Sequence, residues 1–166
     1  MKKEQGFSLI ELLIVVAIIA IIAAIAVPSM LTSRMAANEA GAVQGCRTVG
    51  SAEVAYAAVN NQMYTDFTTL TNSVNGSYLD SRYTGNFNGY SYTENSAVVG
   101  ASTVASAAVP DGFGVLATPT NPGSNGRFEY GIAADQVVRF QQALGGADAP
   151  LCGTASCVGG DPIGKQ

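Results

Sequence analysis

The sequence predicts an α+β protein in which a long N-terminal helix packs, by its second half, on a small antiparallel β-sheet. Three observations predict this fold. Residues 7–30 are almost entirely apolar, and residues 31–63 continue them with an amphipathic helical pattern. Residues 64–166 contain short alternating apolar runs separated by turn residues, which is typical of a globular head built on strands. The chain of 166 residues has room for one such helix and one such head.

The apolar run follows a short charged leader, residues 1–6. From Phe7 to Val27, only Ser8 and Glu11 are not apolar. At about 1.5 Å per helical residue, this length matches a bilayer core of roughly 30 Å. We therefore predict that the first half of the helix crosses a membrane.

Glu11 is a carboxylate inside this apolar run. An ionised carboxylate costs a few kcal/mol in a bilayer, so its presence indicates a function and calls for a cationic partner. A cut after Gly6 would give Phe7 a free amine, which is largely protonated at neutral pH because its ordinary pKa is about 7.7 to 8. Phe7 lies four residues before Glu11 on the same helical face, and the amine of a neighbouring subunit is an equivalent partner. Such a pair would fix the axial register of an apolar bundle, because a subunit out of step would leave both charges unpaired.

A cleaved secretory signal is the alternative interpretation. Lys2 and Lys3 would be its basic region, and residues 24–26 would offer an A-x-A cleavage site. The apolar run exceeds the usual length of roughly 7 to 15 residues for such a signal, and Glu11 lies where a signal tolerates charge least. Both features favour a retained helix.

Residues 6–16 read Gly-Phe-Ser-Leu-Ile-Glu-Leu-Leu-Ile-Val-Val and are followed by Pro28. This pattern resembles the N-terminus of type IV prepilins. In that family a membrane-bound prepilin peptidase cuts between the Gly and the Phe and methylates the new amine, and the Glu neutralises that amine during filament assembly. The resemblance implies cleavage between Gly6 and Phe7, N-methylation of Phe7, and an assembly role for Glu11. It covers about the first 30 residues closely.

The implied function is that of a structural pilin subunit, which polymerises through its apolar helix into a type IV pilus. The implied partners are other copies of the chain in a helical homopolymer, prepilin peptidase, membrane lipid before assembly, and an inner-membrane assembly platform. The precursor would cross the inner membrane once, and the filament would be extracellular. A type II secretion pseudopilin in a short periplasmic filament has the same N-terminus and is the first alternative. A membrane-anchored or secreted binding module, in which Glu11 has no role, is the second.

The amphipathic continuation extends the helix to about Met63. Apolar or small residues recur at mostly three- or four-residue steps among polar ones: Leu31, Met35, Ala42, Cys46, Val49 and Val59. Pro28 interrupts this helix, so we expect a kink or a locally melted stretch at residues 24–28. In a pilin this stretch would let the filament extend; a simple kink at the membrane boundary is the alternative.

Glycines recur in the second half of the helix, at Gly41, Gly45 and Gly50. Each lowers helix stability by roughly 0.5 to 1 kcal/mol relative to Ala, and close packing is one compensation. We expect Gly41 and Gly45 to pack against the protein's own sheet rather than to form a G-x-x-x-G dimerisation motif.

The head is predicted to begin with a long surface connection of little regular structure, residues 64–86. Four short strands follow, at residues 88–92, 112–117, 127–132 and 136–141, with a hairpin turn at residues 133–135. Alternation gives each later strand an apolar face that can cover the helix. Residues 118–126 form a turn-rich loop, and residues 97–109 show no clear period.

Composition favours a structural protein over an enzyme. The chain has no His, which excludes His-dependent acid–base chemistry, and it carries no catalytic or nucleotide-binding fingerprint. Of its 8 basic and 12 acidic side chains, Lys2, Lys3 and Glu4 lie in the leader, which leaves a mature chain with a formal charge of −5. An acidic chain of this kind argues against nucleic-acid binding. No cofactor and no metal are predicted, because three cysteines without His do not make a zinc site.

Cys152 and Cys157 lie in a Gly- and Ser-rich tail, and a domain outside the cytoplasm meets oxidising conditions. A disulfide between them is the leading prediction, and the resemblance also favours a bond near the C-terminus. It would stabilise by only about 2 kcal/mol because the loop is short. Cys46 is expected to be a buried small hydrophobe; a bond from Cys46 to either tail cysteine is the alternative.

Overall fold

A computed structural model describes residues 7–61, 63–72, 74, 76–94, 112–143 and 161–163. Its helices are α1 (Leu9–Val59), α2 (Phe67–Thr71) and the 3₁₀ helix η2 (Ser81–Thr84). Its strands are β1 (Asn86–Phe87), β2 (Tyr90–Glu94), β3 (Gly114–Pro119), β4 (Phe128–Ala133), β5 (Arg139–Gln142) and β6 (Asp161–Pro162). The chain divides into two compact units between Arg34 and Met35. Three parts of the sequence analysis lie outside the described residues. They are Gly6, residues 97–109, for which no element was predicted, and the predicted disulfide of Cys152 and Cys157.

In the first unit, α1 exposes apolar side chains on all sides. Every residue from Phe7 to Arg34 is exposed, and the exposed fractions of Leu9 and Ile25 reach 78% and 74%. This is the one helix, among the described residues, that is long and apolar enough to cross a membrane. A kink or a locally melted stretch was expected at residues 24–28. The helix continues through Pro28, so the expectation of a melted stretch is wrong, and the kink stays a prediction. Proline removes one backbone hydrogen bond, and the helix continues on both sides of that missing bond.

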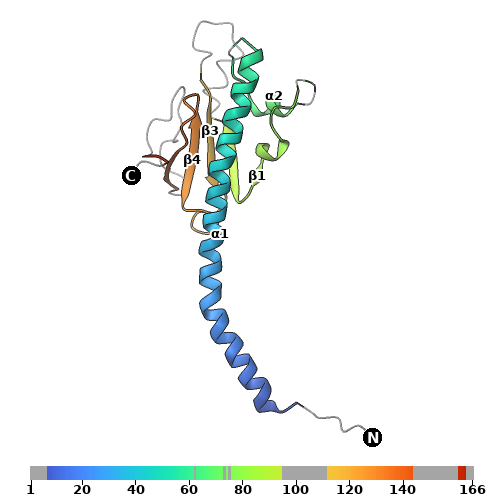
Figure 1. The fold of residues 1–166 in the computed structure, drawn as a ribbon, viewed down its shortest axis with the longest axis vertical. Helices are drawn as coiled ribbons and strands as arrows, with labels where there is room; N and C mark the ends of the chain where they lie inside the picture. Colours follow the sequence, from blue (N-terminus) through green and yellow to red (C-terminus); the bar gives the residue numbers. More distant parts are fainter. Residues whose placement is uncertain are drawn as a thin grey trace. The chain divides into compact units, whose positions relative to one another are not determined.

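In the second unit, six strands form one sheet in the order β1-β2-β3-β4-β5-β6 (Figure 1). Every neighbouring pair is antiparallel, and the register joins Tyr92 to Ala117 and Ala117 to Tyr130 across the centre. The predicted α+β class and the antiparallel sheet are confirmed. The four predicted strands are found with bounds shifted by one to three residues, and β4 and β5 are joined by the predicted turn. The sequence missed β1 and β6, because strands of two residues are too short to show alternation.

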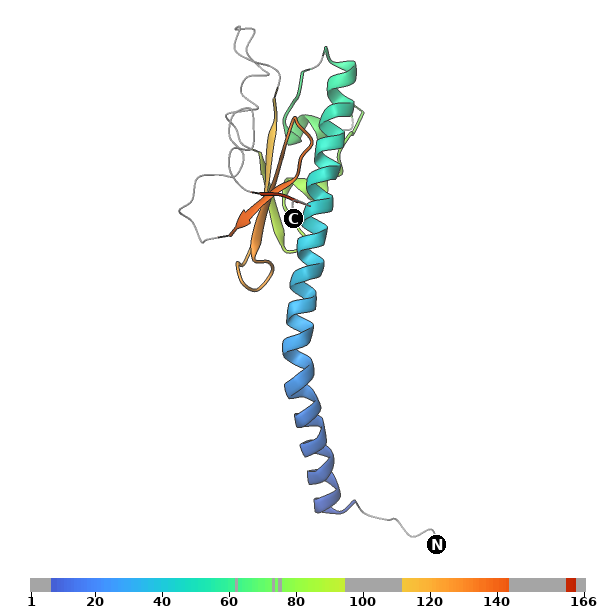
Figure 2. The same cartoon turned by 60° about the vertical axis from the view of Figure 1, so that its left-hand side comes forward.

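The second half of α1 lies along one face of this sheet (Figure 2). A Cβ placed on Gly45 would come within 2.1 Å of the Tyr92 hydroxyl oxygen, and one on Gly50 within 2.8 Å of Ile132 Cδ1. The expectation that glycines let the helix approach the protein's own sheet is therefore confirmed. Cys46 is a free and fully buried thiol, as expected, and burial raises its pKa to about 12.

The buried side of α1 differs from the predicted stripe at its ends. Val59 and Leu31 are 68% and 55% exposed, and the helix ends at Val59 rather than near Met63. Two glutamates, Glu39 and Glu53, are buried in the stripe instead. The stripe consists of Glu39, Ala42, Gly45, Cys46, Val49, Gly50, Ala52, Glu53 and Ala57.

The connection from α1 to β1 was predicted to be surface with little regular structure, and this prediction is wrong. It contains α2 and η2, and it contributes four buried side chains to the core: Phe67, Leu70, Leu79 and Tyr83. Two carboxylates make the short helices possible. Asp66 accepts a hydrogen bond from the Thr69 N–H and Asp80 from the Arg82 N–H, so each caps the first turn of its helix.

Candidate functional site

The first site is the start of α1. Phe7 and Ser8 precede the helix, and the Leu12 N–H donates to the Ser8 carbonyl at 3.2 Å. This places Glu11 in the first helical turn, where a negative charge complements the helix dipole. Glu11 is exposed and forms no ion pair with any described residue. It is the one charged side chain in the apolar run from Phe7 to Val27.

This segment therefore offers a fully apolar, fully exposed helix surface with one carboxylate at its beginning. A helix that is apolar all round is stable only in lipid or inside a bundle of apolar helices. Pro28 lies on the same exposed stretch. The structure describes a single chain, so the partner of Glu11 stays a prediction.

Residues 1–27 match the family model described as the prokaryotic N-terminal methylation motif. The chain carries the type IV pilin and pseudopilin signature. The motif points to a structural protein with a membrane-anchored precursor. No curated protein and no solved structure matches the chain.

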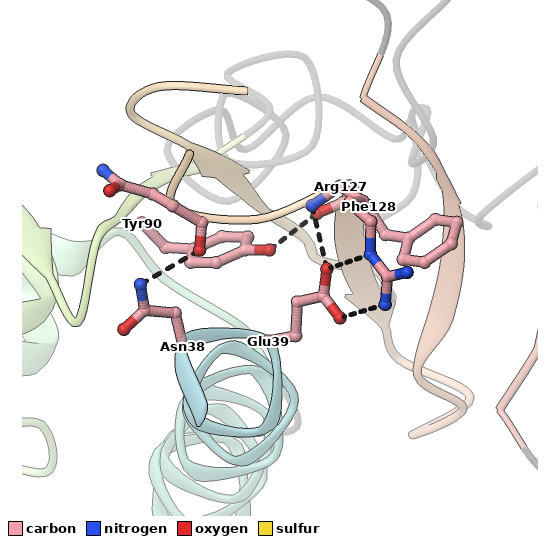
Figure 3. Close-up of polar contacts among 6 residues, drawn as sticks. Asn38, Glu39, Tyr90, Arg127 and Phe128 are labelled. Carbon is pink, nitrogen blue, oxygen red and sulfur yellow. Dashed lines mark hydrogen bonds and ion pairs between the residues drawn. The ribbon is translucent and has the colours of Figure 1, made fainter. Parts of the chain in front are cut away.

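The second site lies on the head, where α1 meets the turn before β4 (Figure 3). Glu39 points from α1 toward Arg127 and accepts three hydrogen bonds from it. The Arg127 backbone N–H donates to Glu39 Oε1 at 2.8 Å, its Nε to the same oxygen at 3.3 Å, and its Nη2 to Oε2 at 3.4 Å. The bond to the carboxylate raises the pKa of Arg127. Glu39 is only 9% exposed, so one buried carboxylate fixes both the backbone and the side chain of Arg127.

Two further contacts fix the same turn. The Asn38 amide nitrogen donates to the Asn125 carbonyl at 3.0 Å, and the Tyr90 hydroxyl donates to the Phe128 carbonyl at 2.9 Å (Figure 3). Asn38 and Glu39 are neighbours on α1, so one turn of the helix anchors the β3–β4 loop at two points. The bonds from Asn38 and Glu39 join residues more than 80 positions apart in the chain, so they tie the helix to the sheet.

An open apolar groove of about 340 Å³ adjoins this polar site. Glu39 and Val43 of α1 form one wall, and Tyr130 and Phe140 of the sheet form the other. Among the described residues, no group of three or more His, Cys, Asp or Glu is arranged to hold a metal ion. The second site is therefore an anchoring contact of the head.

The sequence analysis missed Glu39 because it counted the glutamates of this helix among the polar residues between the apolar positions. A signal was present. Both glutamates lie on the same helical face as the buried stripe, because steps of three and four residues connect Glu39, Ala42, Cys46, Val49 and Glu53. The partner, Arg127, has no such signal, because local periodicity does not reveal contacts across the fold.

We predict that Glu39→Ala destabilises the head by roughly 1–3 kcal/mol, because it removes a buried acceptor from a backbone N–H and a guanidinium. Thermal unfolding of the full-length chain in detergent, followed by circular dichroism, measures the change. Asp80→Ala is the matched control: Asp80 also accepts the backbone N–H and the guanidinium of one arginine, Arg82, but both side chains are about half exposed. An equal loss of stability in both variants would show that burial of Glu39 adds nothing.

Proposed function

We propose that the chain is a pilin, a structural subunit that polymerises through α1 into a type IV pilus. Prepilin peptidase would cut the precursor between Gly6 and Phe7 and methylate the Phe7 amine. The observation that carries the proposal is the exposed apolar segment of α1, interrupted only by Glu11 near its start, within a prokaryotic N-terminal methylation motif.

The physical reason for polymerisation is the exposed surface of this segment. Outside lipid, burial of apolar side chains against a neighbouring helix stabilises the association of the two helices by about 25 cal/mol per Å² of apolar surface removed from water. None of the apolar window of this segment is buried among the described residues. Lipid would cover it in the inner membrane, and other copies of the same helix would cover it in a filament.

Glu11 would set the step of the filament. Repetition of one head-to-tail contact generates an open helix, and a carboxylate in each copy facing the Phe7 amine of another would select a single axial position. A subunit in any other register would bury both charges without partners, at several kcal/mol. An inner-membrane assembly platform would bring the subunits into place.

We predict that the mature protein begins at an N-methylated Phe7. The measurement is the intact mass and N-terminal sequence of protein sheared from the cell surface or, failing that, extracted from membranes. A start at Val27 would identify an ordinary secreted protein, and an intact Met1 would identify a static membrane anchor. Either result would overturn the proposal.

A pseudopilin of type II secretion is the alternative, and the same N-terminus would serve it. The two differ in where the filament is found: sheared surface material for a pilus, the periplasm for a pseudopilus. Fractionation of the processed protein distinguishes them.

A further inference from the structure

Three carboxylates, Glu53, Asp66 and Glu94, lie at the connection between α1 and α2. Glu53 of α1 is 1% exposed, and its Oε2 accepts the Thr65 backbone N–H at 3.2 Å. Glu94, at the end of β2, accepts the Phe67 backbone N–H through Oε1. Asp66 lies between these two anchor points and caps α2. Two buried or half-buried acids from distant elements therefore hold alternate residues of one short connection.

No cation balances these acids among the described residues. The charged groups that face Glu53 are Glu94 from β2 and Asp66 from the connection, and both are acidic. The described ion pairs all lie elsewhere, at Asp80, Glu39 and Asp135. A carboxylate this deeply buried, with like charges nearby, is disfavoured in its ionised form.

We propose that Glu53 and Glu94 form a proton-dependent latch, which holds the connection at residues 63–72 against α1 and β2 while it is protonated and releases it in alkaline solution. Opening of the connection would bring both acids into water, where they ionise freely. The inference does not depend on the filament proposal, because it concerns the head alone.

The direction of the pH effect follows from the pKa values. Burial raises the pKa of Glu53 from 4.5 to about 8; the Thr65 N–H opposes this rise, and Glu94 and Asp66 add to it. Burial likewise raises the pKa of Glu94 to about 7. Between pH 4.5 and these values the closed head binds protons that the open state has lost, so stability of the closed form falls as the pH rises. Each proton released on opening multiplies the opening constant by about ten per pH unit.

The test is amide hydrogen exchange of the full-length chain in detergent at several pH values from 6 to 9, with EDTA present and with rates corrected for chemical exchange. We expect protection of residues 63–72 to fall at least about tenfold relative to the amides of β3 and β4. Glu53→Gln keeps the side-chain oxygen that accepts the Thr65 N–H and has no proton to lose, so it should remove most of this pH dependence. Glu129→Gln, the same change at a half-buried acid on β4 outside the cluster, should retain it.

Two results would overturn the latch: constant relative protection of residues 63–72 in the wild-type chain, or the same pH dependence in Glu53→Gln as in the wild type. If Glu53→Gln does not fold, Glu94→Gln provides the second variant. It should make the loss of protection with pH less steep, because one of the two protons is then absent. An unchanged profile in Glu94→Gln would equally contradict the proposal.

Discussion

Replacement of Glu11 with Ala should abolish filaments while leaving the precursor cleavable between Gly6 and Phe7. In the proposed filament, the substitution leaves the Phe7 amine of another subunit buried without a counter-charge. Loss of one partner of a buried pair costs about 3–5 kcal/mol, which corresponds to a factor of at least about 100 in the equilibrium for adding a subunit. Electron microscopy of sheared material and immunoblots for the processed chain measure the two outcomes.

Three variants separate the charge of Glu11 from its shape. Glu11→Gln keeps the size of the side chain and removes the charge, so it should fail as Glu11→Ala does. Glu11→Asp keeps the charge on a shorter side chain and should retain part of the assembly. Ser8→Ala changes the other non-apolar residue of the same segment and should assemble normally. Filaments of normal length and number from Glu11→Ala would remove the register argument.

Gly45→Ala should destabilise the head, although it adds only one methyl group. The added Cβ would lie 2.1 Å from Tyr92 Oη and 2.6 Å from Tyr92 Cζ, so either the aromatic ring or the helix must move. Overpacking of this kind costs about 1–3 kcal/mol or more, whereas the gain in helix propensity returns only about 1 kcal/mol. We expect a net loss of up to about 2 kcal/mol and a fall in Tm of up to roughly 10 °C for a head of this size.

Gly41→Ala is the matched control, one helical turn earlier on α1. Its Cβ would meet the end of the Asn88 side chain at 3.0 Å, and that amide can rotate away. Its Tm should therefore stay close to that of the wild type. A Tm for Gly45→Ala equal to that of Gly41→Ala would show that the close approach to Tyr92 does not limit stability.

Tyr92→Phe provides a second check on the same contact. The Tyr92 hydroxyl is the sole buried side-chain polar atom, among the described residues, that has no hydrogen-bond partner. Its removal should leave stability unchanged or raise it, because an unsatisfied buried group costs about 1–3 kcal/mol. In the double variant with Gly45→Ala, loss of the hydroxyl should recover part of the lost stability. Additive effects in this double-mutant cycle would contradict a direct clash.

The sequence alone predicted the features that depend on local pattern. The unbroken apolar run and Glu11 identified the first half of α1, and alternation at Phe128, Tyr130 and Ile132 identified β4. Hydrophobic periodicity reports how a segment faces its surroundings, so these predictions did not require knowledge of the partner. The same logic failed for residues 64–86, where polar residues cap short helices and scattered Phe67, Leu70 and Tyr83 fill the core.

The tertiary structure decided which partners these faces meet. Glu39 and Glu53 share the helical phase of the buried stripe, yet only the fold shows that one meets Arg127 and the other Thr65. The contact of Gly45 with Tyr92 is likewise set by how closely the helix approaches the sheet. Local pattern fixes the direction in which a side chain points, whereas its partner depends on the register of strands far away in the chain. The partners of the buried acids and the close contact of Gly45 with Tyr92 could therefore be recognised only once the helix and the sheet were placed together.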